Sequence, residues 1–172
     1  MPTFGPQNAK CFVFTYKDGL LAKAAHDLKL GVNSFRIELA DDRSSVRGEF
    51  DPTSMKVLAA ISDGGVEDKL KPSDLKKIES NIENDVLNVK RFPKITFEST
   101  KVNEVSGGYA LDGNLTLHGV ERAIAVRISS EGNEWVAQAT VDQPSFGITP
   151  FKALMGAIRV QPSVRIEVRI PK

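Results

Sequence analysis

Apolar and polar residues alternate over most of this chain, at the period-two spacing of half-buried β-strands. The clearest case is residues 92–99, Phe-Pro-Lys-Ile-Thr-Phe-Glu-Ser, followed after a turn by residues 113–120, Gly-Asn-Leu-Thr-Leu-His-Gly-Val. In both segments the apolar side chains recur at every second position, so that they share one face of a strand. Two such ribbons predict a β scaffold with an apolar interior.

The same alternation recurs elsewhere and predicts about eight to ten strands. Residues 35–39 and 46–50 form an expected hairpin, joined by the polar turn 41–44. Further strands are expected near residues 12–16, 109–111, 124–128, 135–139 and 164–170. Strands in this number, joined mostly by short turns, close into a barrel or pack as a sandwich. Because closure removes exposed sheet edges, we predict a single-domain, extended antiparallel β-barrel of about eight strands.

Two segments depart from the strand period and predict helices. Between Pro72 and Arg91 the apolar residues follow helical spacing, with Ser73 placed to cap an amphipathic helix. Residues 20–26 are rich in Ala and Leu and follow Asp18, which is a favourable capping residue. We expect this second, short helix to plug one end of the barrel.

Strand alternation also separates residues that face the interior from residues that face water. The interior of an eight-stranded barrel is either filled by its own side chains or just wide enough for one small ligand. The candidate ligand contacts expected on the inward face are Phe14, Phe35, Ile37, Phe97, Leu115, Leu117 and Ile166. The residues expected to face water are Arg36, Glu38, Thr116, Arg165 and Glu167.

A long connection, residues 146–156, is expected to lie across the barrel mouth. It combines large apolar side chains with glycines at its two ends, Gly147 and Gly156. Glycine tolerates backbone angles that other residues avoid, so the segment is suited to move as a lid. Equally, its side chains could complete the core. Its candidate ligand contacts are Phe146, Phe151, Leu154 and Met155.

Composition narrows the choice of partners. The 172 residues fit one domain, with residues 1–9 expected as a tail and 10–172 as the barrel. A formal charge of +1 offers no net field to attract nucleic acid or an anionic membrane. No window reaches the ~18 apolar residues of a membrane span, and the first residues lack the pattern of a signal peptide. We therefore expect a cytoplasmic protein with neither a nucleic-acid partner nor a membrane span.

Four segments together resemble the YceI-like family of lipocalin-like lipid-binding proteins. They are residues 25–28 (Ala-His-Asp-Leu), 92–99, 111–120 and 145–148 (Ser-Phe-Gly-Ile), and the resemblance extends from about Lys10 to the end of the chain. The resemblance implies an extended antiparallel barrel that holds a long isoprenoid, quinone or fatty chain in an elongated apolar tunnel, for carriage or storage. The usual Arg-Asp-x-His-Leu run of the family is replaced here by residues 84–88, Asn-Asp-Val-Leu-Asn. The chain resembles a branch of the family that lacks a signal peptide.

The residues offer little support for catalysis or for a metal site. The two histidines, His26 and His118, have no partners at metal-ligand spacing, and the chain has no nucleophile elbow or phosphate-binding loop. We therefore expect no catalytic residue, no metal and no cofactor. The single cysteine, Cys11, lies in an apolar run and is expected to be a buried small hydrophobe.

A binding protein of a different class remains as the alternative. In that case the barrel is dry, and the apolar surface near Phe151 to Met155 docks a partner or a second copy of the chain as a homodimer. The two readings differ in the interior, because a lipid carrier needs a continuous apolar cavity whereas a docking module needs a filled core and an exposed apolar patch.

Overall fold

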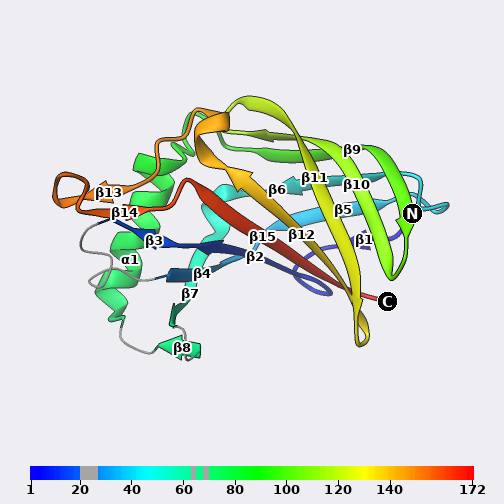
Figure 1. Cartoon of the computed structure of the whole chain (residues 1–172), viewed down its shortest axis with the longest axis horizontal. Coiled ribbons are helices and arrows are strands. Elements are labelled where there is room, and N and C mark those ends of the chain that lie inside the picture. The colour runs from blue at the N-terminus through cyan, green and yellow to red at the C-terminus, as the bar shows by residue number, and fades with distance from the viewer. Residues whose placement is uncertain (20–26, 63–64, 68–69) are drawn as a thin grey trace.

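The computed structural model of the chain describes residues 1–19, 27–62, 65–67 and 70–172 and shows a large antiparallel sheet curled around an apolar interior (Figure 1). Twelve strands form this sheet, in the order β1-β5-β6-β9-β10-β11-β12-β15-β2-β4-β7-β8. The predicted mainly-β antiparallel architecture is confirmed. The strands, however, outnumber the eight that were expected.

The strands divide between the large sheet and a small one. The large sheet contains β1 (Thr3–Phe4), β2 (Lys10–Thr15), β4 (Asp27–Val32), β5 (Phe35–Leu39), β6 (Val46–Phe50), β7 (Met55–Ser62), β8 (Gly65–Glu67), β9 (Ile95–Val105), β10 (Gly108–Leu117), β11 (Val120–Glu131), β12 (Glu134–Asp142) and β15 (Ser163–Pro171). The small sheet contains β3 (Lys17–Asp18), β13 (Lys152–Ala153) and β14 (Ile158–Val160). Residues 1–9 include β1, which pairs with β5.

One long, bent hairpin explains part of the higher strand count. β4 pairs with β7 and β5 pairs with β6, while β4 runs into β5 through Asn33 and Ser34 alone. The second arm of this hairpin, β6 and β7, bends at the same level through the single turn η2 (Pro52–Ser54). There the Ser54 hydroxyl accepts hydrogen bonds from the backbone N–H groups of Asn33 and Ser34 at 3.1 and 2.9 Å. β2 flanks the β4 half and β9 flanks the β6 half, so the bend brings the sheet back around the interior.

Tight turns hold β9, β10, β11 and β12 in a meander. His118 and Gly119 connect β10 to β11, and both have positive φ, of 56° and 72°. Positive φ at both central residues is the geometry of a type I′ turn, whose twist matches that of the flanking strands. The register pairs Leu115 directly with Phe97 across β10 and β9, which contain the two alternating segments identified first in the sequence.

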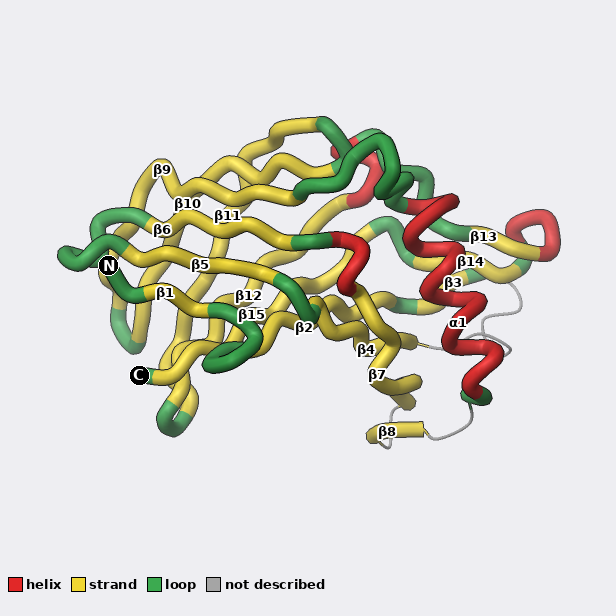
Figure 2. Tube along the Cα trace, turned by 180° about the vertical axis from the view of Figure 1, so that it is seen from behind, coloured by secondary structure: helices red, strands yellow, loops and turns green. Residues whose placement is uncertain are grey.

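A helix covers one end of the curled sheet (Figure 2). α1 (Pro72–Asn81) continues as a π turn, η3 (Ile82–Val86), and its residues Ile78 and Ile82 pack against the core. The predicted cap at Ser73 is wrong. Lys71 is the N-cap, because Pro72 has the φ of a first helical residue and no N–H to satisfy, and the Asp74 carboxylate accepts from the Lys71 N–H at 3.2 Å. The second helix, expected over residues 20–26, lies outside the described residues.

The facing of β2 differs from the prediction. Phe14 lies on the outer face, where the guanidinium carbon of Arg165 is 4.4 Å from its ring centroid and the Lys29 ammonium is 5.9 Å away. Alternate residues of β2, among them Cys11 and Val13, face inward and are buried. The inward placement of Phe14 was wrong because β2 is apolar in both phases, so that alternation alone does not identify its inner face.

Candidate functional site

The interior contains two adjoining cavities of about 440 and 330 Å³. We call the larger one the sheet lobe, because β5, β6, β9 to β12 and β15 line it, and the smaller one the helix lobe, because α1 and η3 contribute to it. Either volume lies within the range of ordinary small-molecule sites, roughly 300–1,000 Å³. Four apolar residues line both lobes and form what we call the waist: Phe50, Leu115, Val141 and Ile166.

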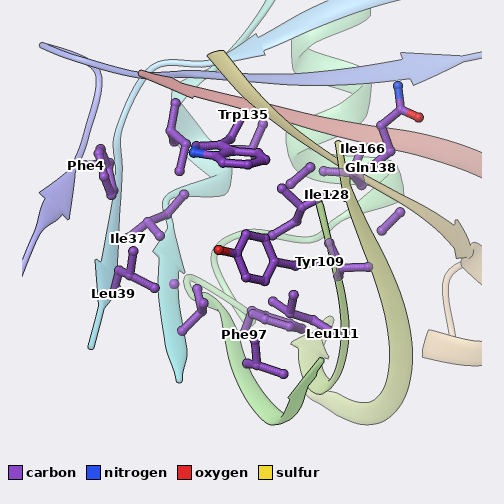
Figure 3. Close-up of a pocket in the computed structure, with 18 of the residues that line it drawn as sticks. Phe4, Ile37, Leu39, Phe97, Tyr109, Leu111, Ile128, Trp135, Gln138 and Ile166 are labelled. Carbon is purple, nitrogen blue, oxygen red and sulfur yellow. The ribbon is translucent and has the colours of Figure 1, made fainter. Parts of the chain in front are cut away.

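Aromatic and aliphatic side chains converge in the sheet lobe (Figure 3). Tyr109 and Trp135 meet edge to face, with ring centroids 5.6 Å apart. The Tyr109 hydroxyl accepts a hydrogen bond of 2.9 Å from Arg43 in the turn between β5 and β6. The amide of Gln138 points away from the other labelled side chains (Figure 3), as the alternation of β12 requires. This lobe therefore combines apolar walls with one hydrogen bond, between Arg43 and Tyr109, at the turn.

Several parts of the fold line the helix lobe. Residues of β2 and β4 form part of its wall, Ile78 and Ile82 of the helical segment line it, and so do Phe151 and Ile158, the latter in the small sheet. Cys11 also lines it, and burial raises the pKa of this thiol to about 12. A thiol with that pKa stays protonated at neutral pH, so Cys11 is an apolar wall residue and not a nucleophile. Its predicted burial is confirmed.

Charged side chains that line the lobes belong mostly to turns and short strands near the two ends of the fold. Asp41 and Arg43 lie in the turn between β5 and β6 beside the sheet lobe, and Lys17 and Arg159 lie in the small sheet beside the helix lobe. Figure 1 places these two regions at opposite ends of the molecule. The four waist residues carry no charge, and Asp51, which follows Phe50 and also lines the helix lobe, has its carboxylate bonded to the backbone N–H and the hydroxyl of Thr53. The combined space is therefore elongated and apolar in its middle.

Six of the predicted contact residues line this space. They are Ile37, Phe97, Leu115, Leu117, Phe151 and Ile166. Two others are buried nearby: Phe35 stacks on Phe50 at 6.1 Å between ring centroids, and Phe146 packs in the core with Leu115 and Val141.

The remaining predicted contacts lie elsewhere. Met155 is fully exposed, with φ of 56°, because the turn η5 (Leu154–Gly156) reverses the chain between β13 and β14, at a distance from the waist. Phe14 faces outward, as described above. The side chain of Leu154 lies outside the described part of the structure.

Sequence reasoning missed several wall residues. Tyr109, Ile128 and Trp135 lie on strands that were expected, and the inward phase of those strands would have identified them. Phe50 could have been found in the same way, on the strand predicted at residues 46–50. The signal for Ile78 and Ile82 was the apolar face of the helix, which nothing in the sequence assigned to a cavity.

The residues expected to face water lie on the outer side of their strands, but one of them, Glu167, is not exposed to solvent. Glu167 lies on the outer face of β15, yet it is only 6% exposed. Its carboxylate accepts a hydrogen bond of 2.6 Å from Arg169, and Arg169 also pairs with Glu134 and Glu131. The prediction that Glu167 faces water is wrong, because its neighbours cover it while its partner cation satisfies its charge.

The described residues contain no group of three or more His, Cys, Asp and Glu side chains that could hold a metal ion. His118 lies in the turn described above, with its ring 4.3 Å from the ring of Phe92. His26 lies outside the described residues. No helix in the described part of the chain is long and apolar enough to cross a membrane.

Comparison with known proteins agrees with this architecture. The model of the YceI-like domain matches residues 21–171. Among solved structures, BcnA of Burkholderia cenocepacia superposes with a TM-score of 0.60 at 14% identity, covering 94% of each chain. A polyisoprenoid binding domain from Saccharophagus degradans gives a TM-score of 0.57 at 8% identity, covering 95% of this chain and 94% of that one. At these identities the likeness concerns the fold.

Sequence relatives match over shorter stretches. A UPF0312 protein of Yersinia enterocolitica is 34% identical over 95 residues, which is 54% of this chain and 47% of the relative. A UPF0312 protein of Yersinia pestis is 44% identical over 50 residues, 28% of this chain and 26% of the relative. The chain thus matches between a quarter and a half of the length of these relatives.

Proposed function

Because the chain belongs to the YceI-like family, we propose that it binds a long apolar molecule, such as an isoprenoid, a quinone or a fatty-acid-like lipid, along the two lobes, and that it does so without covalent chemistry. The observation that carries this proposal is the waist, where the two lobes share a wall made only of apolar side chains. The description of the Saccharophagus neighbour as a polyisoprenoid binding domain supports the same ligand class.

The driving force is removal of the ligand from water. Each methylene group that leaves water contributes about 0.8 kcal/mol, so a chain that extends through both lobes gains more than one confined to a single lobe. The waist offers no charged or hydrogen-bonding side chain, and recognition there depends on shape and length. Such binding is reversible, which suits carriage or storage.

The docking alternative has less support. A docking module needs a filled core and an exposed apolar patch of several hundred Å². Here the interior holds two cavities, and the exposed large apolar side chains of the described strands and turns lie apart, with Leu58 on β7, Val105 on β9 and Met155 in η5. Scattered apolar residues of this kind are ordinary on protein surfaces.

A matched pair of variants tests the proposal by titration with a fluorescent polyene fatty acid. Leu115→Asn sets an amide without a partner in the waist, which costs about 1–3 kcal/mol, and we expect the dissociation constant to rise about tenfold or more. Leu58→Asn makes the same kind of change at a residue that is 52% exposed and lines neither lobe, and we expect unchanged binding. Wild-type protein that gives no saturable signal, or equal losses in both variants, would refute the proposal.

A further inference from the structure

The waist contains one aromatic ring, and its position depends on a glycine. Phe50 ends β6, and Gly48 precedes it by two residues on the same face of the strand. A Cβ atom built on Gly48 would lie 2.8 Å from Cε2 and 3.1 Å from Cζ of Phe50. The ring therefore lies over the glycine, in space that any other residue would fill with its own side chain.

A second aromatic ring limits where the Phe50 ring can move. Phe35, directly opposite Phe50 on β5, stacks on it with an interplanar angle of 21°. Phe35 is itself buried and cannot retreat without leaving a void. If the space over Gly48 were filled, the free direction for the Phe50 ring would be the cavity.

We propose that the Gly48–Phe50 pair determines which ligand lengths the protein accepts, because it sets the width of the passage between the lobes. The inference rests on the proposed function and refines it. With glycine at position 48 the ring stays close to the wall, and one long chain can extend through both lobes. With a side chain there, the ring enters the waist, and the lobes become two separate sites for short chains.

The test compares two all-trans prenols by native mass spectrometry: farnesol, which one lobe can hold, and hexaprenol, which is twice as long and has to pass the waist. Wild-type protein is expected to bind one hexaprenol or two farnesol molecules. Gly48→Ala is expected to weaken hexaprenol binding on the order of tenfold, about 1.4 kcal/mol, while it still binds two farnesol molecules. Phe50→Trp, which enlarges the ring without a change at Gly48, is expected to give the same selective loss.

Two further variants separate the passage from general damage. In the double variant Gly48→Ala/Phe50→Leu the displaced ring is absent, so hexaprenol binding is expected to return to within about twofold of the wild type. Gly31→Ala is the matched control, because the added methyl group would lie 3.1 Å from a side-chain carbon of Leu58 and 3.4 Å from Oδ1 of Asn33, neither of which lines a lobe, and both prenols are expected to bind as in the wild type.

The possible outcomes distinguish a failure of the proposed function from a failure of the length selection alone. Wild-type protein that takes up neither prenol refutes the proposed function and the length selection with it. Wild-type protein that binds both, with Gly48→Ala and Phe50→Trp losing farnesol and hexaprenol alike or losing neither, refutes the length selection and leaves the proposed function standing. Failure of the double variant to recover hexaprenol binding also refutes the role of the ring.

Discussion

The buried carboxylate of Glu167 allows a quantitative test of how much an ion-pair network stabilises the strands of the cavity wall. Glu167 accepts a hydrogen bond of 2.6 Å from Nε of Arg169, whose other two nitrogens contact Glu134 and Glu131 at 3.1 and 3.2 Å. These partners, Glu167 first, raise the pKa of the Arg169 guanidinium, so it remains a cation wherever the fold persists. The network joins β11, β12 and β15 on the face opposite the lobes.

The structure sets the expected magnitudes. Arg169→Met keeps much of the aliphatic stem but leaves Glu167, whose side chain is 8% exposed, without its cation. Breaking a buried pair in this way costs about 3–5 kcal/mol, and we expect the lower end, about 3 kcal/mol, because the Arg169 side chain is 30% exposed. The Glu134 side chain is 42% exposed, so Glu134→Gln should cost at most about 1 kcal/mol.

Urea unfolding followed by circular dichroism measures these differences in the free energy of unfolding. The double variant Arg169→Met/Glu167→Met leaves no charge buried, and we expect it to recover most of what Arg169→Met loses. If Arg169→Met proves no more costly than Glu134→Gln, or if the two methionine substitutions simply add, the role assigned to the Glu167 pair is wrong.

Three other predictions concern the cavity walls. Gly113→Ala should lower the free energy of unfolding by about 2 kcal/mol or more, because its Cβ would lie 2.4 Å from Cζ of Phe97 and 2.7 Å from the backbone oxygen of Glu98; a thermal melt that matched that of Gly31→Ala would contradict this. Burial raises the pKa of Cys11 from 9.0 to about 12, so the stability that it contributes is present below pH 9 and is lost as the pH rises through that interval; Cys11→Ala should remove this part of the pH dependence, and an identical profile in the variant would count against it. Phe151→Asp places a charge in the wall of the helix lobe and should sharply reduce the amount of lipid that solvent extraction recovers from the purified protein, whereas a stable variant with its full lipid complement would show that Phe151 is not part of the binding site.

The inward-facing side of a strand could be predicted from the sequence only where every second residue is charged and so marks the outer side. On β5, Arg36 and Glu38 mark the outer phase, and Ile37 duly lines the sheet lobe. β15 behaves in the same way, with Ile166 at the waist. β2 has no such marker, since Phe12 and Phe14 alternate with Cys11 and Val13, and the facing has to come from its neighbours in the sheet. There Lys29 and Arg165 lie over the outward rings.

The cavity itself could not be predicted in this way. Whether an interior is filled depends on how closely the strands of its wall approach one another and on where the aromatic rings lie. Gly48 and Gly113 have no side chain, and the rings of Phe50 and Phe97 occupy the space that a Cβ atom would take. The turn geometry that exposes Met155 is also invisible to alternation, because positive φ at a non-glycine residue is uncommon. Length and period therefore indicated a single β domain with an apolar interior, and the resemblance to the YceI-like family implied the lipid ligand, while the position of the waist required the structure.

Native mass spectrometry of the protein purified from cells, before and after solvent extraction, tests the central claim most directly. We expect a mass above that of the chain, released by extraction as an apolar, chain-like molecule, and restored when the extracted protein is incubated with a long prenol or fatty acid. A protein that carries only its own mass, and takes up neither compound while its fold is intact, would contradict a lipid-binding cavity.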